Sequence, residues 1–269
     1  MTKAAVIQMT SNADSHENLR KAYSLLQQAA HCGAQLAVLP ENFSFMGMTD
    51  QDKFRIAEQD GDGLVQAWLA RTARELNVWI VAGTVPLKLV GESRVAAACL
   101  VFNAQGERVA RYDKMHLFDV DVDDSTGQYR ESTTLVAGQK PVLVDTPIGR
   151  VGLAICYDLR FPELFRHYSA SGAEVLVVPA AFTVPTGRSH WEVLLRARAI
   201  ENLCYVLAAG QTGLHSNGRT TYGHSMVIDP WGEVVNCQSQ EVGWVIADIN
   251  LHQQRERRGK FPVLSHRRL

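Results

Sequence analysis

Residues 149–164 read GRVGLAICYDLRFPEL and carry the clearest fold signal in the chain. An apolar run over residues 151–155 ends at Cys156, a short Asp-Leu-Arg turn follows, and Pro162 suits the first turn of a helix. The pattern predicts a strand-to-helix elbow, which exposes one side chain at the carboxyl edge of a sheet. Cys156 occupies that position, and the backbone N–H of Tyr157 is the candidate donor to a developing oxyanion.

Similar β-branched runs bounded by turn residues recur on both sides of this segment. They predict strands over residues 4–9, 36–39, 78–83, 98–103, 151–155, 175–179, 205–209, 225–228 and 244–249. Helical patterns separate several of the strands. The clearest begins at Asp14, which has capping-box spacing to Glu17, and ends at Gly33. Two more helices are predicted over residues 162–172 and 188–202, so the pattern indicates a mixed α/β fold.

The composition is that of an ordinary folded domain. Apolar residues make up 46% of the 269 residues, and 27 basic residues nearly balance 28 acidic ones. With almost no net charge, the protein has no strong electrostatic attraction to nucleic acid or to a membrane surface, so we expect a small-molecule partner. No run approaches the ~20 apolar residues of a membrane span, and the N-terminus lacks a signal-peptide core. With no low-complexity linker in view, we expect residues 1–269 to form a single domain.

A catalytic cysteine needs a base or a nearby positive charge, because the thiolate is the reactive species. Histidine is the usual base, and three histidines are possible partners for Cys156: His116, His190 and His224. No HExxH or HxH spacing is present, so we expect neither a metal site nor a cofactor. The remaining cysteines do not lie in such an elbow, so we expect them to pack as small apolar side chains: Cys32, Cys99, Cys204 and Cys237. Their number and spacing indicate no disulfide framework, which favours a reducing cytoplasm.

A carboxylate base is the alternative to histidine. Glu41 follows the predicted strand 36–39, so it lies at a strand's carboxyl end, as Cys156 does on its own strand. Lys114 lies in the alternating stretch RVARYDKMHLFD, which leads to a second loop at that edge. Taken singly, such charges are usually solvated surface residues. Their combination predicts that the acid, the lysine and the cysteine converge.

Three motifs around these residues occur in a fixed order: LPENF, YDKMHLFD and GLAICYDLRFPEL. They resemble the catalytic signatures of the nitrilase superfamily, and the segments AVIQM, AHCGAQLAVLPE, HWEVLLRARAIEN and YGHSMVIDPWGEVV extend the resemblance over nearly the whole chain. The resemblance implies a four-layer α-β-β-α sandwich that forms a homodimer or higher homo-oligomer. It also implies that Glu41 is the general base, that Lys114 stabilises the oxyanion, and that Cys156 forms a thioester.

The resemblance extends to residues around this triad. Glu131, in YRES, matches a second family glutamate that holds the lysine and substrate in register, and a like-charged pair with Glu41 would favour a raised pKa on one of the two. Arg160 is a candidate clamp for a substrate carboxylate, the alternative being an ion pair with Glu163 or Asp158. Phe182 and Thr183 follow the strand after the nucleophile helix and are expected to line the same pocket.

The acidic segment DVDVDDSTGQYRES over residues 119–132 reads as a surface loop and, with GHSMVIDPWG and the final HRRL, resembles the Nit branch of the superfamily. That likeness implies an amidase that cleaves deaminated glutathione to 2-oxoglutarate and cysteinylglycine, a metabolite-repair reaction. An ω-amidase acting on 2-oxoglutaramate would need the same catalytic residues, and the 119–132 loop is the feature expected to discriminate. A non-catalytic binding protein and a zinc hydrolase are the alternatives from other classes, and nothing in the sequence favours nitrile hydrolysis.

Overall fold

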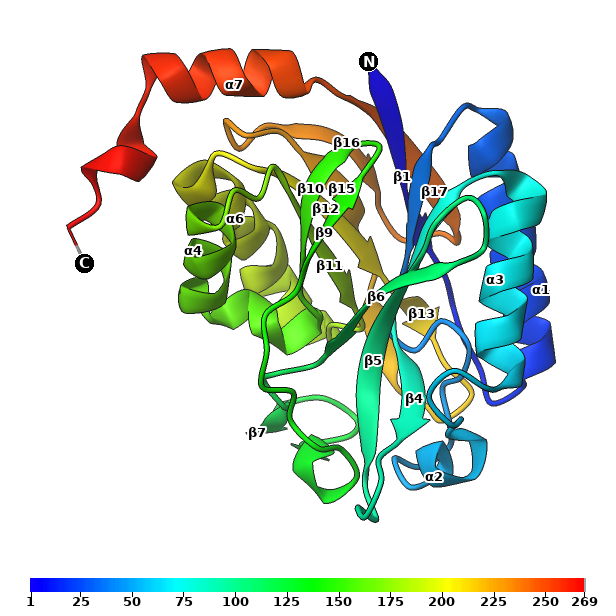
Figure 1. Cartoon of the computed structure of the whole chain (residues 1–269). Coiled ribbons are helices and arrows are strands. Elements are labelled where there is room, and N and C mark those ends of the chain that lie inside the picture. The colour runs from blue at the N-terminus through cyan, green and yellow to red at the C-terminus, as the bar shows by residue number, and fades with distance from the viewer. Residues whose placement is uncertain (269) are drawn as a thin grey trace.

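The computed structural model describes residues 1–268 and places two β-sheets face to face between helices (Figure 1). The first sheet has seven strands in the order β17-β1-β2-β3-β5-β4, with β6 paired to β5. Their bounds are β1 Thr2–Gln8, β2 Leu36–Leu39, β3 Trp79–Ala82, β4 Val85–Lys88, β5 Val95–Phe102, β6 Arg108–Asp113 and β17 Gly243–Ile249. The central strands β1, β2 and β3 run parallel, and the outer pairs are antiparallel.

The second sheet has six strands in the order β16-β15-β12-β11-β10-β9. Their bounds are β9 Leu143–Thr146, β10 Gly149–Leu153, β11 Val175–Ala180, β12 Tyr205–Gly210, β15 Ser225–Ile228 and β16 Val234–Gln238. Here β10, β11 and β12 are the parallel strands. Parallel neighbours need long crossover connections, and these connections carry the helices that cover the sheets.

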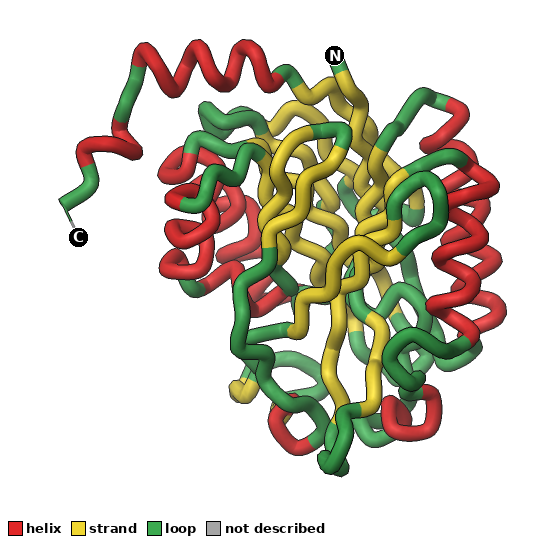
Figure 2. Tube along the Cα trace, in the orientation of Figure 1, coloured by secondary structure: helices red, strands yellow, loops and turns green. Residues whose placement is uncertain are grey.

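Alternation along the strands sends side chains to two different layers. Val6 of β1 belongs to a core shared with the second sheet, whereas Ile7 packs with the helices on the outer face. Figure 2 shows the resulting layers, with helices on both flanks of the strands. Helices α1 (Ser15–His31) and α3 (Leu64–Leu76) cover the first sheet, and α4 (Pro162–Ala170) and α6 (Glu192–Asn202) pack on the second. The predicted four-layer sandwich is confirmed.

All nine predicted strands are present, and the helix predicted from Asp14 is α1. Asp14 is its N-cap and accepts a hydrogen bond from the backbone N of Glu17 at 3.1 Å. The capping box is only half formed, because the Glu17 carboxylate accepts instead from Asn12 Nδ2 at 2.7 Å. After the helix, Gly33 has φ +90°, a conformation that favours glycine.

Two predicted segments differ from the structure. The helix expected over residues 188–202 begins as a π-helical turn at Gly187–Trp191, and regular α6 starts only at Glu192. The 119–132 segment is not irregular throughout: β7 (Asp119–Asp121) and β8 (Gln128–Arg130) form a small antiparallel hairpin. A 3-10 turn, Glu131–Thr133, follows it. Short polar strands carry little hydrophobic pattern, so these two strands could not be predicted from the sequence.

A second small hairpin pairs β13 (Thr212–Leu214) with β14 (Thr220–Tyr222). The short helix α2 (Asp52–Ile56) lies in the connection after β2, and the short helix α5 (Val184–Thr186) lies in the connection after β11. Helix α7 (Leu251–Lys260) lies beyond β17 and leads to a C-terminal segment that projects away from the sandwich (Figure 1). Over residues 1–268 no helix has the length and apolar character needed to cross a membrane.

Candidate active site

Cys156 lies in a tight turn directly after β10. It opens the 3-10 turn Cys156–Arg160 with φ +47°, a left-handed conformation that is strained for a residue with a Cβ. Pro162 then starts α4, as the sequence predicted. The turn is the expected elbow, and it leaves the cysteine side chain buried but in contact with a cavity.

The elbow is held by Asp158, whose carboxylate is fully buried. Its Oδ2 accepts from the backbone N of Ile155 at 2.8 Å and from the hydroxyl of Tyr112 at 2.7 Å. Its Oδ1 accepts from the backbone N of His116 at 3.0 Å and lies 2.7 Å from His116 Nδ1, where a protonated nitrogen donates. One carboxylate therefore ties the cysteine turn to the strand and loop that carry Lys114.

Glu41 follows β2 of the opposite sheet, so the acid and the cysteine approach one another from different sheets. The next residue, Asn42, has φ +57°, and its N–H donates to Thr84 Oγ1 at 2.8 Å. The carbonyl oxygen of Glu41 accepts from Gln211 Nε2 at 2.9 Å, and the same nitrogen lies 2.7 Å from Ser11 Oγ. These buried contacts fix the backbone that presents the Glu41 carboxyl.

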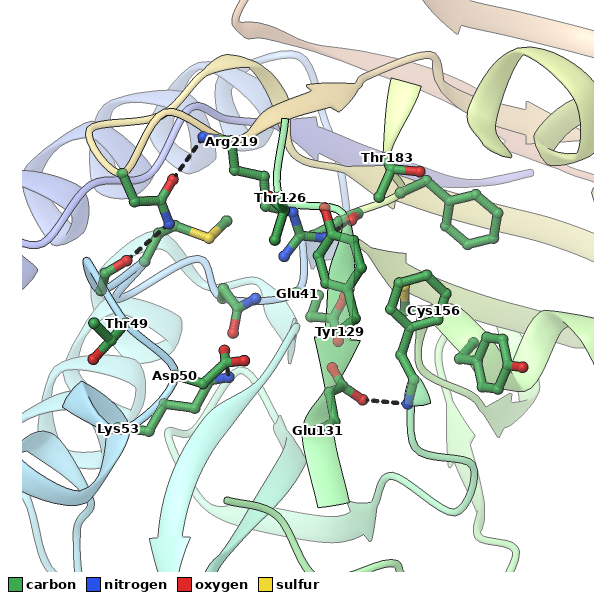
Figure 3. A pocket seen from close by; sticks show the side chains of 18 of the residues that line it. Glu41, Thr49, Asp50, Lys53, Thr126, Tyr129, Glu131, Cys156, Thr183 and Arg219 are labelled. Atoms are coloured by element: carbon green, nitrogen blue, oxygen red, sulfur yellow. Dashed lines mark hydrogen bonds and ion pairs between the residues drawn. The ribbon is translucent and has the colours of Figure 1, made fainter. Parts of the chain in front are cut away.

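Lys114 follows β6 and is only 1% exposed. Its Nζ donates to Glu41 Oε1 at 2.9 Å and to the two oxygens of Glu131 at 2.9 and 2.7 Å. Glu131 also accepts from the backbone N of Phe118 at 2.8 Å. The structure thus brings Glu41, Lys114 and Glu131 into direct contact, with the ammonium between two carboxylates. Figure 3 shows Glu41, Glu131 and Cys156 around the same cavity.

The charges in this cluster set the protonation of the thiol. Burial and the Glu41 carboxylate raise the pKa of Cys156 well above its usual value, although Lys114 acts in the opposite direction. Burial opposes the charge on Lys114, but Glu131 and Glu41 raise its pKa well above the usual value. A neutral thiol beside a carboxylate and a fixed ammonium suits proton transfer to the carboxylate as the sulfur attacks an electrophile.

Of the two acids expected to repel one another, Glu131 is not one whose pKa is raised. Burial favours its neutral form, but the Lys114 ammonium and the Phe118 N–H keep its pKa below the usual value. Repulsion between Glu41 and Glu131 alone would raise the pKa of one of them. The lysine between them reverses the balance, because an opposite charge within hydrogen-bond distance stabilises the carboxylate.

A cavity of about 220 Å³ opens beside these groups. It is bordered by Glu41, Glu131 and Cys156, by the loop after β2, by the β7–β8 hairpin and by residues after β11. Figure 3 shows Tyr129, Thr183 and Arg219 around its upper part and Thr49, Asp50 and Lys53 on the side of Glu41. The charged and aromatic lining suits a small polar molecule.

The four expected substrate-contacting residues all line this cavity: Tyr157, Arg160, Phe182 and Thr183. Arg160 pairs with neither Glu163 nor Asp158. Its guanidinium lies 5.7 Å from the ring centre of Tyr157 and 5.3 Å from that of Phe182, and Nη1 is 3.2 Å from Nδ1 of His190. Without a carboxylate partner, it is available to an anionic ligand.

None of the three histidines considered as a base for Cys156 lines the cavity, and neither does any other histidine of the described part of the chain. His116 is bound to Asp158, His190 lies against Arg160, and His224 bonds the Tyr222 carbonyl through Nδ1 at 2.8 Å. Within residues 1–268 there is also no cluster of His, Cys, Asp or Glu suited to a metal ion.

Several cavity residues were missed from the sequence. Asp50, Lys53, Tyr129 and Arg219 line the outer cavity, and Asp158 had been considered only as an ion-pair partner of Arg160. A polar residue before an Asn-Gly turn, as in the segment SNGR, marks a loop but gives no hint of where the loop folds. The Asp158 signal was present in the motif itself, because an acid two residues after an elbow can bond the turn's backbone N–H.

Comparison with known proteins gives a consistent result. The family model described as carbon-nitrogen hydrolase matches residues 3–258. A protein of Synechocystis sp. named deaminated glutathione amidase is 46% identical over 98% of this chain and 97% of its own length. The crystal structure of the Caenorhabditis elegans NitFhit protein superposes with a TM-score of 0.92 at 41% identity, covering 99% of this chain and 65% of that one. Saccharomyces cerevisiae Nit3, described as a member of branch 10 of the nitrilase superfamily, superposes with a TM-score of 0.88 at 28% identity, covering 97% and 94%.

Proposed function

Since this chain belongs to the carbon-nitrogen hydrolase family and its close relatives are amidases, we propose that it cleaves the amide bond of deaminated glutathione to give 2-oxoglutarate and cysteinylglycine. We propose Cys156 as the nucleophile, Glu41 as the general base and Lys114 as the electrostatic stabiliser. The observation that carries the proposal is the Glu41–Lys114–Glu131 cluster beside a buried Cys156 at the edge of a cavity of about 220 Å³.

In the first half of the reaction, Glu41 takes the thiol proton as the sulfur attacks the amide carbonyl. The carbonyl oxygen becomes an oxyanion, which Lys114 and the N–H of Tyr157 stabilise. Glu41 then returns the proton to the departing nitrogen, the C–N bond breaks, and cysteinylglycine leaves behind a thioester on Cys156.

In the second half, water takes the place of the leaving amine. Glu41 removes a proton from this water as it attacks the thioester carbonyl, and the same donors stabilise the second oxyanion. Collapse expels the Cys156 sulfur, which recovers its proton from Glu41, and 2-oxoglutarate leaves. Glu131 holds the ammonium in place throughout, since both of its oxygens bond Lys114 Nζ.

The test compares kcat/KM for deaminated glutathione and 2-oxoglutaramate in one preparation, with Cys156→Ala as the blank. That ratio measures the difference in transition-state binding between the two amides. We expect a clear preference for deaminated glutathione that disappears in the variant. Preference for 2-oxoglutaramate would make the protein an ω-amidase with the same mechanism, and undiminished activity in Cys156→Ala would overturn the assignment of the nucleophile.

We further propose that residues 1–269 form one domain, because a single buried core contains side chains of both sheets. One cooperative unfolding transition is expected, and two resolved transitions would contradict it. A cytoplasmic location is part of the same proposal, since all five cysteines are free, as is usual in a reducing compartment. Export of the full-length chain in a fractionation of its source cells would contradict this location.

A homodimer is also part of the proposal. Trp231 and Phe261 are each half exposed with ring centres 5.5 Å apart, and Ile200 of α6 is 49% exposed beside Gly232. Exposed apolar side chains that lie near one another are typical of a subunit contact. Light scattering coupled to size-exclusion chromatography should give at least twice the monomer mass, and Ile200→Glu should reduce it. A monomeric wild type would refute the dimer.

A further inference from the structure

Two cations that line the cavity form no salt bridge with an acidic side chain of residues 1–268. Lys114 is bonded by Glu41 and Glu131, and Lys53 pairs with Asp50 at 2.9 Å. The other two cations that line the cavity are Arg160 and Arg219, and their only polar partners are His190 Nδ1 and the carbonyl oxygen of Ala181. The cavity therefore holds two guanidinium groups with donors free for an anion.

The substrate proposed above has two carboxylates, one at each end. One belongs to the oxo-acid half, which stays on the enzyme as the thioester, and the other belongs to the glycine of the departing dipeptide. 2-Oxoglutaramate has only the first. A site with two guanidinium groups matches the charge of the longer molecule, because each planar fork can bind a carboxylate in bidentate fashion.

Arg219 belongs to the hairpin that is attached to the Glu41 side of the cavity. Gln211, which precedes β13, donates to the Glu41 carbonyl at 2.9 Å, and Asn217 at the hairpin tip donates to the Gly47 carbonyl at 2.8 Å. Arg160 instead lies in the cysteine's own 3-10 turn. Since Glu41 must reach the departing nitrogen to protonate it, the leaving group lies on its side of the scissile bond.

The guanidinium of Arg219 is held in place but not saturated. It lies 5.1 Å from the ring centre of Tyr129, and Nη2 donates to the Ala181 carbonyl at 2.6 Å. Its Nε–H is buried and has no hydrogen-bond partner among the described residues. A buried unpaired donor on a cation is costly, and an incoming carboxylate would satisfy it.

The β7–β8 hairpin completes this subsite. Tyr129 of β8 lies under the guanidinium, and Ser125 Oγ donates to the Gly218 carbonyl at 3.4 Å across the two hairpins. Tyr129 is itself fixed, since its hydroxyl donates to Asp124 Oδ2 at 2.8 Å. The acidic 119–132 segment thus contributes an aromatic support for Arg219 rather than a direct charge contact with an anionic substrate.

We propose that Arg219 binds the terminal carboxylate of the leaving peptide and so selects peptide amides that end in a free carboxylate over amides that lack one. The inference rests on the proposed function, and it deepens that function by naming the group that selects the leaving half. Arg160 then holds the carboxylate of the oxo-acid half, which both candidate substrates share.

The experiment measures kcat/KM for deaminated glutathione and for its C-terminal carboxamide, which differ only in the terminal charge. The variants are Arg219→Gln, Arg219→Lys and, as a matched control, Arg71→Gln on the exposed face of α3. The wild type should prefer the free acid by roughly 10- to 100-fold, the range of a charge-assisted hydrogen-bond pair. Arg219→Gln should bring the acid-to-carboxamide ratio near one, and Arg71→Gln should leave it unchanged.

Arg219→Lys keeps the positive charge but lacks the planar guanidinium, so its acid-to-carboxamide ratio of kcat/KM should lie between that of the wild type and one. This variant tests the proposal if Arg219→Gln does not fold. A wild-type ratio retained in a folded Arg219 variant, or no preference in the wild type, would overturn the role of Arg219 while leaving the amidase intact. A wild type inactive on both compounds would overturn the proposed function and this inference together.

Discussion

Replacing Asp158 with asparagine tests how Cys156, the proposed nucleophile, and Lys114, the proposed oxyanion stabiliser, are held together. The carboxylate lies entirely inside the protein and accepts from two backbone N–H groups, those of Ile155 and His116, as well as from Tyr112 and the His116 ring. Asparagine has the same shape but presents only one acceptor oxygen. Its amide nitrogen must therefore face one of the two backbone N–H groups.

The size of the effect follows from these contacts. A buried N–H without an acceptor costs about 1–3 kcal/mol, and the remaining hydrogen bonds lose their charge assistance. We expect a total loss of roughly 2–4 kcal/mol, and for a domain of this size even the lower figure lowers Tm by about 4 °C or more. Because Lys114 is two residues from His116 and Cys156 follows Ile155, the distance between ammonium and sulfur should also change. A misplacement of this kind lowers kcat by about 100-fold.

The assay combines calorimetric Tm with kcat and KM on deaminated glutathione. Tyr112→Phe is the matched control, since it removes one donor and leaves both backbone N–H groups paired, so it should lower stability by only about 1 kcal/mol and change kcat little. A loss in kcat at unchanged KM would indicate mispositioned catalytic groups rather than a damaged binding site. The reasoning is refuted if Asp158→Asn keeps the wild-type Tm and kcat.

Three further predictions concern protonation. The folded-state pKa of Glu131 is lowered, so its ionised form stabilises the fold above pH 4.5, and this stabilisation is lost as the pH falls through the folded-state pKa. The Tm difference between wild type and Glu131→Gln should therefore shrink in acid. A Tm difference that does not depend on pH would contradict the ion pair. The thiol pKa of Cys156 is raised, so its alkylation by iodoacetamide in the free enzyme should keep accelerating beyond pH 9, where an early plateau would instead indicate a preformed thiolate. Burial lowers the pKa of His215 to about 4, so the unfolded chain binds more protons than the folded one between pH 6.5 and 4, and the free energy of unfolding should fall by about 3 kcal/mol over this range. Denaturant titrations of His215→Gln should show a smaller fall. An equal fall in the variant would mean that other groups cause it.

Much of the fold could be predicted because the buried strands are short apolar runs with clear boundaries. Strands 36–39 and 225–228 were predicted to the residue, and they become β2 and β15 at the interior of the two sheets. Helix α3 was missed, although Trp68 and Leu69 lie on its buried face. Its N-cap position is Gly63, which gives no side-chain capping signal, so nothing in the pattern marked its beginning.

The candidate site shows where sequence reasoning stops. Cys156, Glu41 and Lys114 each follow a strand, and the rule that strand ends gather functional groups was enough to expect them together. Arg219 lies between β13 and β14 and Lys53 lies in the short helix α2, and the position of both depends on contacts such as that between Asn217 and the Gly47 carbonyl. Such contacts join residues 170 positions apart and leave no periodic trace in the sequence. The direction of the Glu131 pKa shift could not be derived from the sequence for the same reason, because it depends on where the Lys114 ammonium lies.

The most direct test of the account is to look for the thioester itself. Glu41→Gln should still bind deaminated glutathione but cannot activate water, so any acylated enzyme that forms should persist longer than in the wild type. Rapid mixing followed by acid quench and intact-mass spectrometry should detect it. Peptide mapping should then place the 2-oxoglutaryl group on Cys156. The account predicts that adduct in the wild type during turnover and its absence in Cys156→Ala. Turnover of deaminated glutathione by Cys156→Ala at the wild-type rate, or an acyl group on another residue, would contradict it.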